Sequence, residues 1–288
     1  MRHRLGKTIL AGVLLAGTAA AAGCAQPPVE IVPVGVQPSA DVSDLAAVLS
    51  AVRTGDGRFD PRKLADCAGR LEAQLARMVV SGPTATPHLY PTYGSRWAYW
   101  YNARAAWSLK LALLARCPST VDGRRFRARR FPLDGGQTSL DAIDALLLAD
   151  ARRTGDVRLA ACVPGVTFAY AALPERPFTA EDFSRGLDGP FNELLLDGRR
   201  TVLDVEARRL RLPEMLWQGR DVVLAAYAAR YGPADATVVT ALRSAAGPEA
   251  RRRLADAIGY PAAAHRTETL TIPGRAIYYP GKLGRVEP

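Results

Sequence analysis

Helical spacing dominates the pattern of apolar and polar residues along this chain. In residues 41–52 and 64–78, apolar side chains recur every three or four positions, which predicts amphipathic helices. Residues 97–116 are apolar on nearly every side, so we expect a helix in the middle of the fold there. Ser139 precedes another amphipathic run at 140–153 and is a suitable N-cap.

The C-terminal half continues mainly helical. We expect helices at 179–196, 213–231 and 234–258, because each segment keeps the helical repeat of apolar positions. Gly189-Pro190 and Gly247-Pro248 are expected to interrupt the first and the last of these helices.

Several short segments read instead as strands. They are bounded by glycine or charged turns and have alternating or continuous apolar residues over a few positions. The predicted strands are 124–133, 157–163, a hairpin of 201–205 with 208–212, and an edge strand at 267–272. The prediction is therefore one mainly helical α+β domain over residues 39–288.

The N-terminus has the pattern of an export signal. Residues 1–7 are cationic, residues 8–22 are apolar or small, and Cys24 follows directly after Gly23. This order predicts a bacterial lipoprotein signal at 1–23, cleaved after Gly23, with the lipid (palmitate included) attached to Cys24. An ordinary signal peptide or a membrane helix is the alternative, but the run is short for a span of about 20 residues.

A proline-rich segment at 24–38 follows the signal and is predicted to be an extended tether. Acylated Cys24 would make membrane lipid a partner and place the protein in the cell envelope, facing the periplasm. Ala25 stands where known lipoproteins retained at the inner membrane have aspartate, and by that resemblance we expect the outer membrane.

Charge adds a class of partners. The formal net charge is +10, with 48% hydrophobic and 23% charged residues, ordinary values for a globular protein. The basic excess suits an anionic cell-wall polymer, lipid headgroups or an envelope protein. The arginines of 124–130 either bind such a partner or form the solvated face of a strand. Nucleic acid is not expected, because no aromatic residues alternate with a basic face.

The order of several motifs resembles the domain of unknown function 547 family, found in exported bacterial proteins. The resemblance covers roughly residues 60–235 and rests on four segments. They are the aromatic helix with Trp100–Ala103, the run Ser139–Asp144, the Cys162 segment, and the hairpin that leads into Leu212–Gln218.

Departures from the family pattern fall on polar residues. Arg104 and Ala105 replace a Tyr and an Asn of the aromatic helix, and Asp144 and Ala145 replace a Glu-His pair. Packing residues such as Leu140 and Ile143 are retained. The resemblance therefore implies a preserved fold in which the family's polar centre is reduced.

Candidate chemistry centres on Cys162. A thiol hydrolase needs a thiolate, an imidazole within hydrogen-bond reach and an orienting group. The candidates for catalysis are Cys162 with His265, or less directly His88. The apolar surroundings of Cys162 favour an unreactive buried thiol instead.

Four further residues are singled out. Asn102 and Asp144 are candidates for orienting a ligand, and for Asn102 a tie to neighbouring backbone is the favoured alternative. Cys67 and Cys117 either form a disulfide or remain buried thiols. Scattered histidines give no metal site, and we expect no cofactor. The predicted role is a non-catalytic binding or structural domain; the alternative is a papain- or transglutaminase-like thiol hydrolase or transferase.

Overall fold

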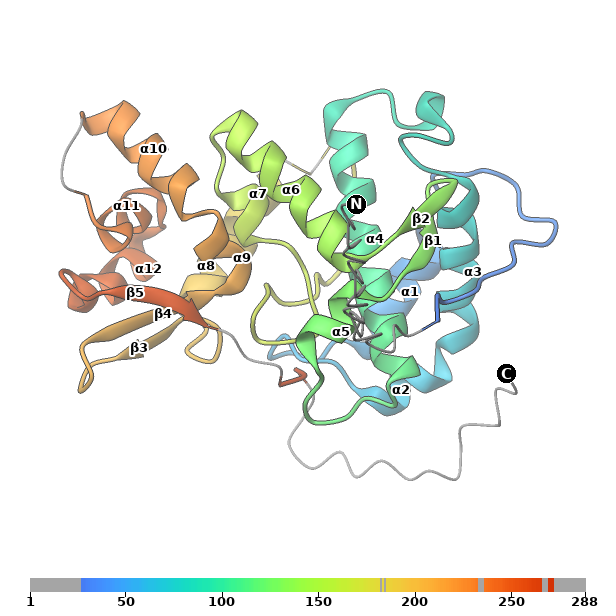
Figure 1. Ribbon diagram of the computed structural model, residues 1–288, viewed down its shortest axis with the longest axis horizontal. Helices are drawn as coiled ribbons and strands as arrows, with labels where there is room; N and C mark the ends of the chain where they lie inside the picture. The colour runs from blue at the N-terminus through green and yellow to red at the C-terminus, as the bar shows by residue number, and fades with distance from the viewer. Residues whose placement is uncertain (1–26, 182, 184, 233–235, 266–268, 272–288) are drawn as a thin grey trace, which may run out of the picture.

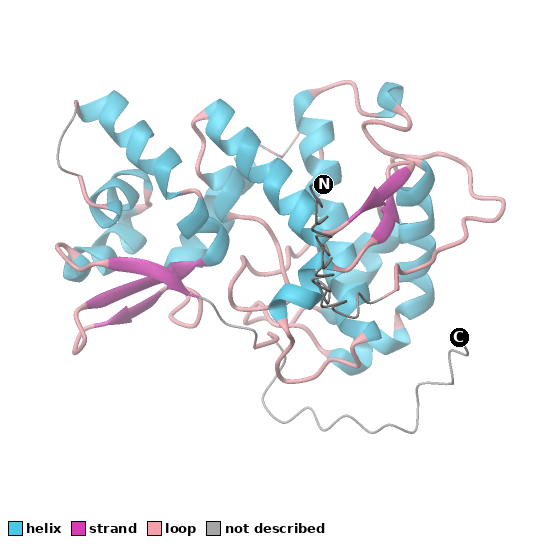
Figure 2. Ribbon diagram, viewed as in Figure 1, coloured by secondary structure: helices cyan, strands magenta, loops and turns pink. Residues whose placement is uncertain are grey.

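Helices form most of the molecule, as predicted, and two small sheets lie far apart within it (Figure 1, Figure 2). The structure is a computed structural model that describes residues 27–181, 183, 185–232, 236–265 and 269–271. One end holds the first helices and a hairpin. The other end holds the last helices and a three-stranded sheet, so the fold is mainly helical α+β.

The α-helices described are α1 (Ser43–Val52), α2 (Pro61–Asp66), α3 (Ala68–Val80), α4 (Tyr93–Leu114), α5 (Gly123–Ala128), α6 (Leu140–Thr154), α7 (Arg158–Ala161), α8 (Asp188–Leu196), α9 (Glu214–Gln218), α10 (Arg220–Tyr231), α11 (Val238–Ala245) and α12 (Pro248–Arg253). The 3-10 helices are η1 (Pro87–Leu89), η2 (Arg185–Leu187) and η3 (Leu254–Ala257).

The strands form one hairpin and one mixed sheet. They are β1 (Phe131–Leu133), β2 (Gly136–Thr138), β3 (Val202–Asp204), β4 (Arg209–Pro213) and β5 (Ala262–His265). β1 pairs antiparallel with β2, and the predicted hairpin of β3 with β4 is antiparallel as well. β5, which the sequence pattern did not indicate, adds to β4 in parallel.

Helix α4 is the central element of the core, as its apolar pattern predicts. It begins with a capping box, in which the Ser95 backbone N–H donates to the Thr92 hydroxyl at 3.1 Å. The helix packs against α3 and α6. Trp107 is fully buried and stacks on Phe131 of β1 with 4.1 Å between ring centroids, which ties the hairpin to the helix.

Two segments predicted as strands are helical over part of their length, although the end of the segment expected at 124–133 does form the strand β1. Residues 123–128 form α5, because Asp122 caps them by accepting from the Arg125 N–H, and their arginines and alanine favour helix. Residues 158–161 form α7, which starts where Asp156 accepts from the Arg158 N–H at 3.0 Å. A short apolar run does not distinguish a buried strand from a buried helix.

The helix expected at 179–196 starts later, at Asp188. Proline is tolerated in the first turn, so Gly189-Pro190 opens α8 instead of interrupting it. The edge strand expected at 267–272 is reduced, in the residues described there, to isolated bridges of Thr269 with Thr120 and of Leu270 with Thr167.

The N-terminal signal and Cys24 lie outside the described residues. Residues 27–42 contain no helix or strand, but the segment contacts the domain near its own N-terminal end. Val29 is buried, and its backbone N–H donates to the Arg130 carbonyl at 2.9 Å. Part of the predicted tether therefore lies against the domain.

Candidate functional site

Cys162 follows α7 as its C-cap residue and is buried, with 2% of its surface exposed. Its thiol donates to the Leu187 carbonyl across 3.5 Å. Burial raises the pKa of the Cys162 thiol far above its ordinary value, and the nearby Arg158 opposes this only in part. The thiol is therefore protonated at neutral pH, the state in which cysteine is a poor nucleophile.

The predicted imidazole partners do not meet this thiol. The charges that shift its pKa come mainly from Arg158, Asp156, Asp188 and Glu193, and the hydrogen-bond partner of the thiol among the described residues is the Leu187 carbonyl. His265 ends β5, opposite Pro213, where burial and Arg211 lower its pKa. Its Nδ1 has no hydrogen-bond partner in the described part of the chain. His88 lies exposed in η1.

Asn102 forms hydrogen bonds with backbone groups, as its favoured alternative predicts. Its amide nitrogen donates to the Phe178 carbonyl and its amide oxygen accepts from the Phe178 N–H, both at 2.9 Å. The residue borders a hollow of about 280 Å³, but the partners of its amide come from the protein itself. Asn102 therefore positions the loop around Phe178.

Asp144 belongs to a buried ionic cluster with Arg104, a residue that was not among the candidates predicted from the sequence. Arg104 Nε and Nη2 donate to the two Asp144 oxygens at 2.8 and 3.2 Å. The Tyr170 hydroxyl donates to Asp144 at 2.9 Å, and the Arg104 guanidinium lies 4.1 Å from the Tyr170 ring centroid. Arg104, Asp144 and Tyr170 thus form a buried polar cluster whose members bond to one another.

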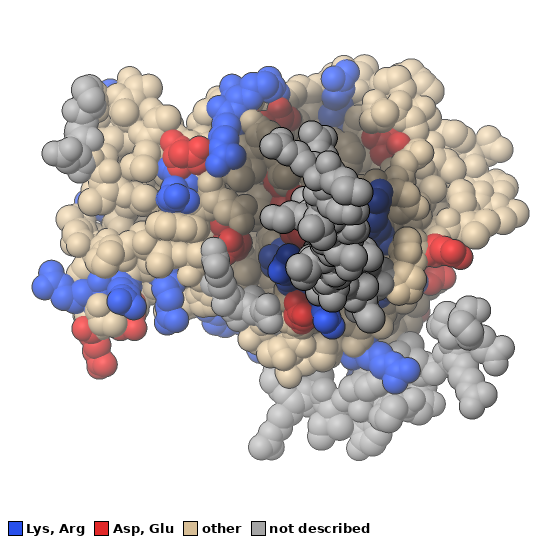
Figure 3. Space-filling model, in the orientation of Figure 1, with Lys and Arg blue, Asp and Glu red and all other residues tan. Residues whose placement is uncertain are grey.

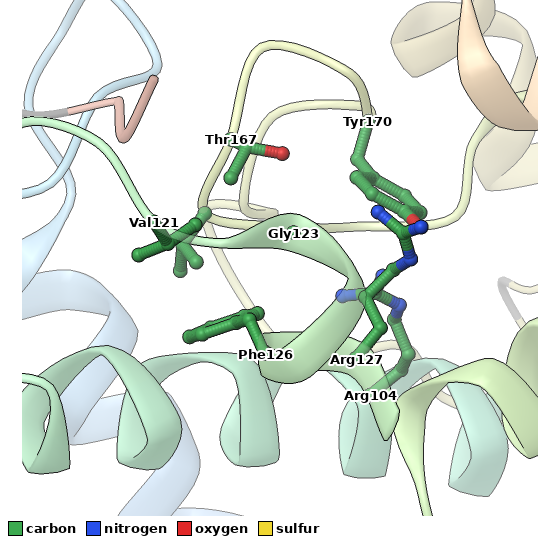
Figure 4. Close-up of a pocket in the computed structure, with 8 residues that line it drawn as sticks. Arg104, Val121, Gly123, Phe126, Arg127, Thr167 and Tyr170 are labelled. Atoms are coloured by element: carbon green, nitrogen blue, oxygen red, sulfur yellow. The ribbon is translucent and has the colours of Figure 1, made fainter. Parts of the chain in front are cut away.

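A small cavity adjoins this cluster (Figure 4). Figure 4 shows the side chains of Arg104, Arg127 and Tyr170 close together at one side of it. Its volume of about 10 Å³ suits a single water molecule and no organic substrate. Burial, and secondarily the Asp144 charge, raise the pKa of the Tyr170 phenol, so that its proton stays in the cluster.

A larger concave site lies elsewhere, between the loop 162–178 and helix α8. This cleft has a volume of about 420 Å³ and includes Cys162 in its lining. Arg53, at the C-terminal end of α1, and Arg200 line it as well. The thiol contributes to the wall of the cleft without being activated there.

The charged side chains of the cleft differ in how deeply they are buried. Arg53 donates to the Leu173 carbonyl at 2.8 Å and pairs with Glu175 and Glu193 at 3.0 and 3.5 Å. Arg200 is 1% exposed. Burial lowers the pKa of Arg200 to about 10, so its guanidinium remains charged at neutral pH.

The remaining predictions concern a disulfide, a metal site and a membrane span. Cys67, Cys117 and Cys162 are free thiols in the structure, which corresponds to the alternative to a disulfide between Cys67 and Cys117. Burial raises the pKa of the Cys117 thiol to about 12. Among the residues described, no group of three histidine, cysteine or carboxylate side chains is arranged to hold a metal ion. Every helix in that part is too short or too polar to cross a membrane.

Comparisons with protein-family models, with curated proteins and with solved structures give no match for this chain, so the resemblance described above rests on its motifs alone and stays a prediction.

Proposed function

We propose that this chain is a lipid-anchored protein of the bacterial cell envelope whose globular domain binds a partner without catalysing a reaction. The anchor rests on the cationic, apolar and small-residue order that ends at Cys24. The binding role rests on how the domain uses its polar residues.

The state of Cys162 carries the argument against catalysis. A thiol enzyme requires a thiolate beside an imidazole. Here the thiol is buried and hydrogen-bonded to the Leu187 carbonyl, its pKa is raised, and neither His88 nor His265 is its hydrogen-bond partner. The thiol hydrolase alternative would need a rearrangement that exposes Cys162 and moves His265 to it.

Other candidate polar groups have structural partners. Asn102 holds Phe178, and Asp144 holds Arg104 and Tyr170. Two hollows, of about 420 and 410 Å³, fall in the size range of small-molecule pockets. The first, the cleft beside Cys162, is the better candidate because the buried Arg200 lines it. Binding in this cleft is the function that the geometry supports best.

Alkylation of the three free thiols tests the proposal. The folded protein is treated with iodoacetamide between pH 6 and 9, and each cysteine is quantified by mass spectrometry. We expect Cys162 to react only after unfolding, because its thiol is buried and protonated. Cys67, which is partly exposed, should react first and serves as the internal reference.

The His265→Ala variant is the control for the enzymatic alternative. Rapid labelling of Cys162 at neutral pH in the folded protein, slowed by His265→Ala, would establish an activated nucleophile and refute the non-catalytic role.

A further inference from the structure

The cleft contains a buried arginine whose hydrogen bonds are incomplete. Arg200 Nη2 donates to the Gly57 carbonyl at 3.3 Å, but Nε and Nη1 have no hydrogen-bond partner among the described residues. Nη1 lies 3.6 Å from an Asp197 oxygen, beyond hydrogen-bond distance. Buried donors without partners are rare in folded proteins, and one at a cleft indicates a group supplied by a ligand.

Asp197 does not complete the pairing of Arg200. Its two oxygens already accept from Arg199 at 2.9 and 3.0 Å. The carboxylate is thus shared between two arginines. Arg200 has this ion pair at 3.6 Å and the Phe168 ring 5.2 Å from its guanidinium, so its charge is only partly compensated. Removing a charge from water without a full partner is costly, so a further anion beside Arg200 is favourable.

Negative charge lies further out in the same cleft. Glu175 and Glu193 have side chains 80% and 51% exposed, whereas the Arg53 side chain between them is 11% exposed. Arg53 and Arg200 thus lie deep, while the exposed part of the lining carries Glu175, Glu193 and Arg176. A ligand with a carboxylate facing Arg200 and an amino group beside the two exposed glutamates would complement both regions.

Much of the remaining lining is apolar. Pro164, Pro174, Pro177 and Pro190 line the cleft together with Phe178. The prolines restrict the backbone in their segments, whereas Gly186 and Gly189 in the same lining do not. The space suits a molecule of the size of a short peptide.

We propose that this cleft binds a short peptide through its free C-terminal carboxylate, which sits on Arg200, while the peptide's amino group lies at the rim beside Glu175 and Glu193. The assignment rests on the proposed binding function and names its ligand class. The carboxylate supplies acceptors for Arg200 Nε and Nη1, and the apolar walls cover the peptide between its two ends.

Calorimetric titration of the full chain in detergent with trialanine tests this assignment. The comparison ligands are its C-terminal amide, its N-acetyl form and inorganic phosphate. We expect trialanine to bind, the amide to bind about tenfold or more weakly because the charged acceptor is gone, and the other two to bind more weakly than trialanine.

Variants separate binding from folding. Arg200→Met should weaken trialanine binding by about tenfold or more without lowering the thermal unfolding midpoint, because it removes a poorly paired buried charge. Arg200→Lys keeps the charge and should retain part of the binding. Arg152→Met is the matched control, since Arg152 pairs with Asp221 on the surface and is not part of the cleft lining.

Several results would overturn the proposal. They are no trialanine binding at millimolar concentration, equal binding of the amide or the N-acetyl form, tighter binding of phosphate, or unchanged binding in a folded Arg200→Met protein. Alkylation of Cys162 is read independently, so failure of the ligand assignment and failure of the non-catalytic role are distinguishable.

Discussion

Two buried arginines of this protein have different environments. Arg104 faces a carboxylate that it contacts through two nitrogens, and a tyrosine completes the cluster. Arg200 is equally buried but shares its nearest carboxylate with Arg199. The Arg104 cluster stabilises the fold, whereas the donors of Arg200 that have no partner leave hydrogen bonds for a ligand to make.

Breaking the Arg104 pair should destabilise the fold. Asp144→Asn leaves the guanidinium buried without its counter-charge, for an expected loss of about 3–5 kcal/mol in the free energy of unfolding, measured in urea. Replacing both residues with apolar ones, Arg104→Met with Asp144→Leu, should recover most of that loss. A double variant no more stable than Asp144→Asn would contradict this account of the pair.

At the scale of elements, the loop around Phe178 depends on helix α4. Asn102 gives this loop two hydrogen bonds, and Phe178 also packs edge-on against the ring of Tyr101 at 5.2 Å. The same loop borders the cleft, so its position sets the shape of that wall.

Asn102→Leu should loosen this loop. It removes both bonds and leaves the Phe178 backbone groups unpaired, at an expected cost of about 1–3 kcal/mol. Limited proteolysis should then cut near residue 178 faster than in the unmodified protein. Ser108→Ala on the same helix removes a buried hydroxyl bonded only to its own helix, and it should leave the cleavage rate unchanged.

Some features of the fold follow from the neighbouring sequence, whereas others depend on contacts between distant segments. Ser139 caps α6 as predicted, and the β3–β4 hairpin is found where its turn residues predict it. Helices α5 and α7 were missed because a single turn carries too little periodicity. The Arg104–Asp144 contact joins residues 40 positions apart, and the incomplete pairing of Arg200 depends on several segments, so neither follows from local pattern.

At the scale of the whole molecule, charge is unevenly spread. Lysine and arginine side chains gather along the end with the three-stranded sheet (Figure 3), where Arg208, Arg209 and Arg211 are exposed. This surface would attract an anionic partner, and that attraction would weaken as salt is raised.

The lipid anchor is tested on the intact chain in bacteria. Cys24→Ser should move the protein from the membrane fraction to the soluble fraction and remove the mass added by acylation. Cys67→Ser, inside the domain, should leave fractionation unchanged. Continued membrane association of Cys24→Ser would show that another part of the chain holds it there.

The contact of Val29 with the domain sets how far an anchored molecule can stand from its membrane. The five residue steps between Cys24 and Val29 span at most about 17 Å when fully extended, and Val29 is bound to the Arg130 carbonyl. The surface near Arg130 would therefore remain within that distance of the bilayer. An anchored domain would then have a preferred orientation, with its rotation about the membrane normal free and its tilt restricted.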